Sequence, residues 1–504
     1  MIEPVEPAIW NPHMAAHLLN RAGFGGTPEH AAALAELKPE EAVRALVRGT
    51  WPAGDNQDVP PPAWVEAPDT YARPGFRKNS GLSPEERQRQ QQIFRRLQIE
   101  RIESLQHWWL NRMRHAAHPL QEKMTLFWHG HFATSFEKVR HAGAMYAQNQ
   151  MLRAHATGNL RDLLRAVARD PAMLVYLDNA QSRKSNPNEN FAREFMELFT
   201  LGEGRYTEQD VREAARAFAG WSIEPDRMFF QRKARESDRG NKEFLGENGP
   251  FDGDDIIDII LRQPACAPFI VRKLWRFLAW DEPDEWLIEA LAEQFRIDDY
   301  AIESLLENIL LSRAFYTLDQ AYAQIKSPVY WLVNSCIVLE GTLPDARACG
   351  QITRLLGQEL FMPPNVKGWD GGPSWITAAT LMQRYNTAGY LVKGAQGMKS
   401  APARRKKKRS DDEAMMMNDD KPDGIEGMSA IADLDRILPR SRRKTMNDAY
   451  DYLEWRFFQR TLSEREKHTI KLYLTKKPMT AIISDVELRN FLHVMMSTPH
   501  FQVC

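Results

Sequence analysis

The stretch SPEERQRQQQIFRRLQIERIESLQHWWLNRMR, residues 83–114, indicates the fold class. Its first four residues predict a helix start, because serine caps the first turn and proline occupies a position that needs no N–H donor. Apolar residues then recur at three- and four-residue spacing and form one stripe: Ile93, Leu97, Ile102, Leu105, Trp109 and Met113. We expect one long helix that packs across the body of the protein.

The same helical spacing dominates the rest of the 504 residues, whereas alternating β-branched patterns are scarce. Hydrophobic residues make up 43% of the chain and charged residues 26%, which is the balance of a globular protein and excludes a wholly disordered or collagen-like chain. We therefore predict an all-α fold with a large multi-helix body.

Composition also divides the chain. Residues 55–81 are rich in proline, which removes hydrogen-bond donors, so we expect a loop or extended arm there. Residues 396–430 contain a basic run at 404–409 followed by acids, which is typical of a disordered, low-complexity linker. We predict a main helical body over residues 1–395, this linker, and a C-terminal helical subdomain over residues 431–504.

Charge and cysteine usage limit the partners and the compartment. Lysine and arginine number 66 against 67 acids, so no global field favours nucleic acid or an anionic membrane. The four cysteines form no CxxC pair, which fits a reducing compartment. The first ten residues have no basic or apolar signal region, and no window reaches the roughly 18 apolar residues of a spanning helix. We expect a cytoplasmic protein without a nucleic-acid or membrane partner.

Four ordered motifs resemble those of one protein family: HLLNRAGFG (17–25), LFWHGHF (126–132), NPNENFAREFMELFTLG (186–202) and FMPPNVKGWDGGPSW (361–375). The chain is similar to the bacterial Domain of Unknown Function 1800 (DUF1800) family, from about Ala15 to Phe501. The resemblance implies no established activity. It does imply a partner or a shared substrate, because members of the family often occur beside a sulfatase-like or alkaline-phosphatase-like companion protein.

His129 and His131 are candidate metal ligands, because imidazole is a common ligand of divalent ions. In an extended segment both rings would share one face, whereas on a helix residues two apart diverge by about 200° and cannot hold one ion. The structural alternative is that Trp128, His129 and Phe132 end a helix by packing and hydrogen bonding. A divalent metal is therefore a possible cofactor whose identity the sequence leaves unknown.

Glu194 and Glu197 are candidate catalytic carboxylates, because they share a face of the expected helix 188–201 with Asn190. Two carboxylates in different environments can serve as general acid and general base. Asp178, which ends an apolar run, could bring a third carboxylate to the same place. In the structural alternative, Arg193 forms i, i+4 ion pairs with Glu189 and Glu197.

The stretch 363–375 is a loop by composition, with candidate substrate-binding side chains between its glycines and prolines: Asn365, Lys367, Trp369, Asp370 and Trp375. Tryptophan faces combined with directional polar groups are typical of pockets for small polar ligands. The structural alternative is an Ω-loop whose tryptophans fill the core.

Together these patterns favour a metal-dependent or acid–base hydrolase acting on a polar substrate, such as a glycan or another cell-surface component. The rival hypothesis is a non-enzymatic helical interaction protein, working with the sulfatase-like partner, whose polar motifs are buried networks that fix the fold.

Overall fold

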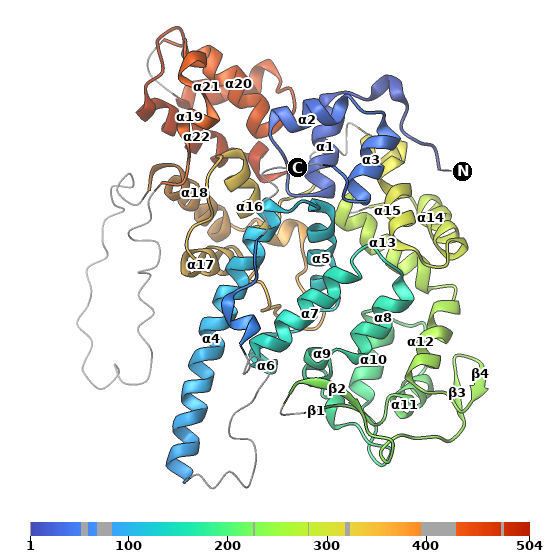
Figure 1. Ribbon diagram of the computed structural model, residues 1–504. Coiled ribbons are helices and arrows are strands. Elements are labelled where there is room, and N and C mark those ends of the chain that lie inside the picture. The colour runs from blue at the N-terminus through green and yellow to red at the C-terminus, as the bar shows by residue number, and fades with distance from the viewer. Residues whose placement is uncertain are drawn as a thin grey trace.

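The computed structural model describes residues 2–51, 59–67, 83–224, 227–280, 282–317, 323–394, 430–474 and 478–504. These residues form 22 α-helices and two small antiparallel sheets, so the all-α fold predicted from the sequence is confirmed. The helices assemble into an elongated body (Figure 1).

The first half of the chain contributes the helices α1 (Pro12–Ala22), α2 (Pro28–Ala35), α3 (Pro39–Val47), α4 (Pro84–His115), α5 (Pro119–His131), α6 (Phe136–Val139), α7 (Ala142–Ala154), α8 (Leu160–Arg169), α9 (Pro171–Tyr176), α10 (Glu189–Glu197) and α11 (Glu208–Ala217). The second half contributes α12 (Gly253–Arg262), α13 (Cys266–Leu278), α14 (Glu285–Ile297), α15 (Ile302–Leu311), α16 (Pro328–Val338), α17 (Ala346–Leu356), α18 (Ala378–Lys393), α19 (Leu434–Ile437), α20 (Met446–Phe458), α21 (Glu464–Leu474) and α22 (Asp485–Ser497). Many of these helices begin with a proline that follows a capping side chain. Thr27 caps α2 and Ser83 caps α4 in this way.

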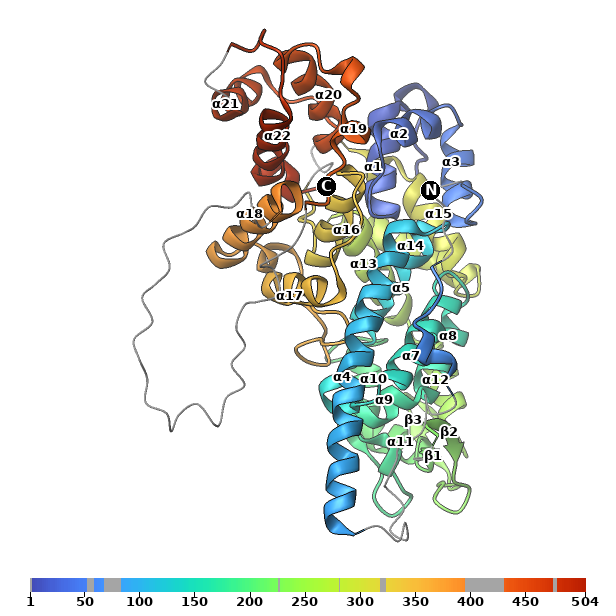
Figure 2. The ribbon, with the colours of Figure 1, turned by 60° about the vertical axis from the view of Figure 1, so that its left-hand side comes forward.

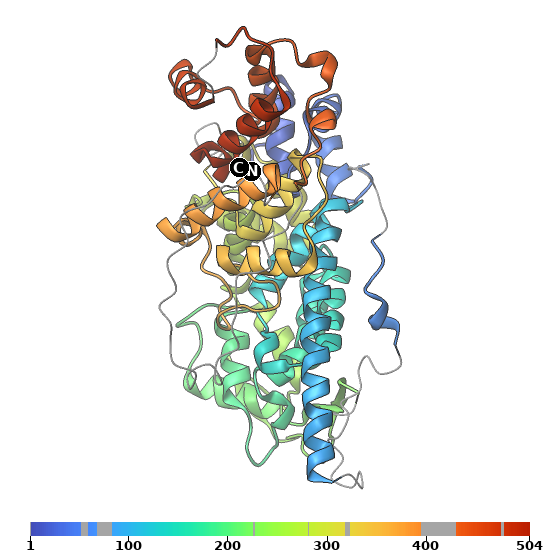
Figure 3. The ribbon, with the colours of Figure 1, turned by 90° about the vertical axis from the view of Figure 1, so that its left-hand side faces the viewer.

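The long helix α4 runs along the body and projects beyond it (Figures 2 and 3). Ile102, Leu105, Trp109 and Met113 are buried, and α4 contacts α5, α7, α16 and α17. The predicted stripe does not extend to the start of the helix, because Ile93 is 59% exposed. The inclusion of Ile93 in the packed stripe was therefore wrong, because the start of the helix projects beyond the body.

The two sheets are two-stranded. Strand β1 (Trp221–Glu224) pairs with β2 (Phe229–Arg232), and β3 (Lys242–Phe244) pairs with β4 (Glu247–Gly249). Both lie with α8–α12 at the end of the body opposite the C-terminal helices (Figure 1). Trp221 and Phe244 bury their rings in the core, so the sheets cover one end of the helical body.

Helices α19–α22 pack against the N-terminal and central parts of the body (Figure 1). The Asn20 amide donates a hydrogen bond to Gln459 Oε1 at 2.7 Å, and Arg456 Nε donates one to the Val338 carbonyl at 2.8 Å. The separate identity of a subdomain over residues 431–504 stays a prediction. The predicted linker lies outside the described residues except for its last residue, as does the predicted arm except for residues 59–67.

No helix in the described part of the chain has both the length and the apolar character that crossing a bilayer requires.

Candidate functional site

A cavity of about 1010 Å³ opens between α5, α13, the start of α16 and the loop 363–375. Its volume is at the upper end of the range of small-molecule sites, roughly 300 to 1000 Å³. Five of the candidate residues line it: His131, Lys367, Trp369, Asp370 and Trp375. Asn365 is exposed instead, and its side-chain oxygen accepts a hydrogen bond from the Lys367 N–H at 2.8 Å. That bond shapes the turn that presents Lys367.

His131 and Lys273 form one wall of the cavity. His131 Nε2 bonds to the Phe199 carbonyl at 3.0 Å, and the Lys273 ammonium lies 3.2 Å from Nδ1. Because a carbonyl only accepts, Nε2 carries the proton and Nδ1 accepts from lysine. Burial and the Lys273 charge hold the pKa of His131 well below its ordinary value. The ring is therefore neutral around pH 7 and fixes the lysine by a hydrogen bond.

His129 lies on a different side of α5 and is 1% exposed. Its Nε2 accepts the N–H of Phe361 at 3.0 Å, and its ring packs edge-on against Trp109. Burial lowers its pKa to about 3, so the ring stays neutral. The interaction joins the end of α5 to the segment that leads into the loop 363–375.

Both histidines belong to α5, so their rings diverge as the helical geometry requires. Binding one shared ion would require the hydrogen bonds to Phe361, Phe199 and Lys273 to break. Among the described residues no group of three or more histidine, cysteine, aspartate or glutamate side chains is arranged to hold a metal. A metal at His129 and His131 stays a prediction, and it needs a conformation other than this one.

The loop 363–375 rests directly on the end of α5. Gly368 has φ of +82°, and a Cβ there would lie 2.3 Å from the Gly130 carbonyl oxygen. Only glycine therefore allows this approach at position 368. The approach brings the Trp369 ring to within 5.7 Å of the His129 ring, measured between centroids. Trp375 is buried and Trp369 is half-buried, and both line the cavity.

Glu194 and Glu197 lie half-buried on α10, whose C-terminal end meets the cavity wall through Leu198 and Phe199. Burial, followed by the charge of Glu197, raises the pKa of Glu194, and the Lys367 ammonium acts in the opposite direction. Glu197 accepts a hydrogen bond from the Tyr206 hydroxyl at 2.6 Å. The two carboxyl groups thus have different surroundings. Neither of them lines the cavity, but Lys367, which does, acts electrostatically on Glu194.

The expected ion pairs within α10 are not formed. Arg193 instead makes a bidentate ion pair with Glu208 of α11, at 2.6 and 2.9 Å. This ion pair between two helices has the bidentate geometry that arginine prefers with a carboxylate. Glu197 therefore forms its hydrogen bond with Tyr206 and no ion pair with Arg193.

Comparison with known families agrees with the motifs. The family described as "Protein of unknown function (DUF1800)" matches residues 17–503. The chain belongs to this family. No curated protein and no solved structure matches it.

Asp178 of this DUF1800 protein lies apart from the cavity lining. It is exposed, adopts a left-handed conformation with φ of +62°, and forms an ion pair with Lys138 at 2.7 Å. Tyr176, two residues earlier, has its pKa raised by burial and then by the charge of Glu194. Asp178 therefore follows a segment that approaches Glu194 and itself points to a surface lysine.

Sequence reasoning missed the cationic residues of the DUF1800 cavity: Lys123, Lys273, Arg276 and Lys326. Lys123 and Lys273 sit in helices α5 and α13, where buried apolar residues lie about one helical turn away: Leu120 and Phe127 around Lys123, and Ile270 before Lys273. A lysine on the apolar stripe of a helix is rare in a protein core. That is the signal by which these two residues could have been found.

Proposed function

We propose that the protein is a hydrolase that takes a polar substrate into the cavity beneath residues 363–375 and uses Glu194 and Glu197 as its acid–base pair. A glycan or another cell-surface component is the proposed substrate class. The observation that carries the proposal is the unequal environment of the two carboxyl groups, together with the electrostatic action of the cavity-lining Lys367 on Glu194.

The raised pKa of Glu194 keeps more of this carboxyl protonated near neutral pH than an ordinary glutamate. Glu194 would donate its proton to the leaving group. Glu197, which accepts the Tyr206 hydroxyl proton in a hydrogen bond, would take a proton from the attacking water. The water oxygen bonds to the electrophilic atom, the scissile bond breaks, and exchange with solvent restores both carboxyl groups.

A metal-assisted form of the same reaction would use His129 and His131 as ligands. The acid–base form is preferred because it needs no rearrangement of the hydrogen bonds that now engage both rings.

The alternative is a non-enzymatic interaction protein that works with a sulfatase-like partner. It is favoured by the extent to which polar motif residues serve the fold, as His129 does by bonding to Phe361. In that case Glu194 would have no role that a glutamine could not fill.

The test is a panel of p-nitrophenyl glycosides, esters and sulfates, applied to the wild type and to Glu194→Gln and Glu197→Gln. Glu189→Gln, an exposed residue on the same helix, is the matched control. We expect one substrate class to be cleaved, at least a hundredfold loss in both variants, full activity in the control, and melting temperatures within a degree or two. Absence of turnover by folded wild type, or unchanged turnover in both variants, would favour the interaction protein.

A further inference from the structure

Three lysines from three different segments line the same cavity: Lys123 of α5, Lys273 of α13, and Lys326, which lies just before α16. Lys123 and Lys326 are each 4% exposed, and Lys273 is partly buried. Burying an ammonium group is costly unless an opposite charge compensates it. Such a concentration of buried cations in one cavity therefore needs a reason.

The hydrogen-bond and ring partners of these ammonium groups are neutral. Lys123 lies over the Tyr330 ring, 4.3 Å from its centroid, and Lys326 lies 4.1 Å from the centroid of Phe501. Lys273 donates to the Leu198 carbonyl at 3.0 Å and to His131. Within the described residues none of the three forms an ion pair with a carboxylate.

The charges around the lysines do not offset the cost of burial. Cys504 supplies an opposing charge to Lys123 and Lys326, and Arg21 and Arg384 add smaller positive charges near them. Glu282 and Asp370 also line the cavity, outside ion-pairing distance of the three lysines. Burial lowers the pKa of Lys123 and Lys326 to about 7 and that of Lys273 to about 8. A bound anion would restore full protonation.

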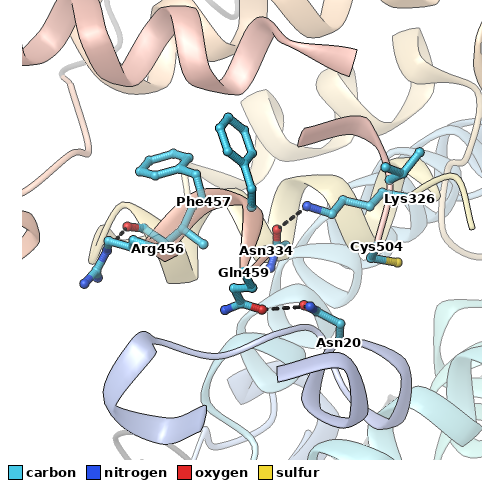
Figure 4. A pocket seen from close by; sticks show the side chains of 10 residues that line it. Asn20, Lys326, Asn334, Arg456, Phe457, Gln459 and Cys504 are labelled. Atoms are coloured by element: carbon cyan, nitrogen blue, oxygen red, sulfur yellow. Dashed lines mark hydrogen bonds between the residues drawn. The ribbon is translucent and has the colours of Figure 1, made fainter. Parts of the chain in front are cut away.

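Lys326 is held in place at the wall of the cavity. Its ammonium donates to Asn334 Oδ1 at 2.9 Å, as Figure 4 shows. Lys326 and Cys504 also line a second pocket of about 10 Å³. That volume holds about one water molecule, so a larger ligand must occupy the first cavity.

We propose that the cavity binds an acidic saccharide, whose sulfate or carboxylate groups are the missing partners of Lys123, Lys273 and Lys326. Trp280 and Trp369 line the same cavity and offer flat apolar faces for the sugar rings. As an assignment of substrate class this rests on the proposed function, whereas the binding itself is measured without turnover.

Isothermal titration calorimetry tests the proposal with three probes of similar size: a sulfated heparin disaccharide, trigalacturonic acid and neutral maltotriose. We expect the wild type to bind at least one acidic probe and not maltotriose. The preferred acidic probe distinguishes sulfate from carboxylate recognition. Binding of maltotriose with equal affinity, or of none of the three probes, would overturn the proposal.

The variants Lys123→Met, Lys273→Met and Lys326→Met should each weaken acidic-probe binding at least tenfold, with Lys184→Met, an exposed lysine, as the control. Their ligand-free melting temperatures should equal or exceed that of the wild type, because an uncompensated buried charge is removed. Unchanged affinity in all three would contradict the proposal. If a variant does not fold, the wild-type pH profile decides, because affinity must fall between pH 6 and pH 9.

Glu194→Gln separates this proposal from the hydrolase. Acidic-probe binding that persists in this variant without any turnover in the wild type would leave the ligand assignment standing and remove the reaction. Turnover of neutral substrates alone would leave the hydrolase proposal standing and remove the assignment of an acidic ligand.

Discussion

Glu122 and Lys123 are adjacent on α5 and almost equally buried, with 1% and 4% exposure, yet they have opposite surroundings. Glu122 accepts hydrogen bonds from Arg153 at 2.7 and 2.9 Å, from Arg112 at 2.8 Å and from the Trp109 indole at 2.9 Å. Lys123 faces the Tyr330 ring and the cavity. Glu122 is fully compensated, whereas the opposing charge of Cys504 does not offset the burial of Lys123.

The difference separates a group that stabilises the fold from one that is available to a ligand. A buried carboxylate with two arginines and an indole is a closed network, and removal of any member leaves charges unpaired. A buried ammonium group that lies over an aromatic ring at a cavity wall can still interact with a ligand that enters the cavity. Burial alone therefore does not distinguish these two residues, whereas the presence or absence of an ion pair does.

The largest effect is expected from Glu122→Ala. Removing this carboxylate leaves Arg153 buried without its counter-charge, and breaking such a pair costs about 3–5 kcal/mol of unfolding free energy. Urea denaturation measures the loss, with Glu203→Ala, an exposed glutamate, as a control that should change by less than about 0.5 kcal/mol. A loss from Glu122→Ala as small as that of the control would show that the network is not structural.

The next largest effect concerns His129, which resembles Glu122 in being sealed by its partners. We expect His129→Ala to lose about 2–4 kcal/mol, because it opens space in the core and leaves the Phe361 N–H without an acceptor. His131→Ala should lose less, because His131 borders a cavity that water can enter.

Inductively coupled plasma mass spectrometry on the same proteins tests the metal prediction. We expect no stoichiometric metal in any of them. Stoichiometric metal in the wild type that disappears from both variants would contradict the structural role of His129 and require the two rings to converge.

The fold was accessible from the sequence because local signals and periodicity agree. Ser83 caps α4 as its sequence predicts, and the apolar spacing marks the buried residues of α4 from Ile102 onward. The spacing wrongly predicted burial of Ile93, because periodicity shows which face of a helix is apolar but not whether another element packs against it.

The candidate site was accessible only in part. The composition of residues 363–375 and the His131 motif each pointed to residues that the structure places on one cavity. Their contact depends on Gly368 lying against Gly130, 238 positions apart in the chain, which no local pattern encodes. The partner of Arg193 was unpredictable for the same reason, because Glu208 competes from a different helix.

The smallest expected effect is on the pH dependence of the unfolding free energy, to which Glu122 and Lys123 contribute in different pH ranges. Burial alone would raise the pKa of Glu122, but Arg153 and Arg112 hold it below the ordinary value. Its contribution to stability is present at neutral pH and is lost as the pH falls through that lowered pKa. Burial lowers the pKa of Lys123 to about 7, so between pH 7 and pH 9 the unfolded chain binds a proton that the folded protein does not.

Stability of the ligand-free protein should therefore rise over that window, by up to about 1.4 kcal/mol per pH unit for each such lysine. Urea denaturation at pH 7, 8 and 9 measures the slope for the wild type, Lys123→Met and Lys184→Met. Lys123→Met should flatten the slope and the exposed control should not. An equal slope in all three proteins would mean that Lys123 is already compensated in the folded state, and the contrast with Glu122 would then disappear.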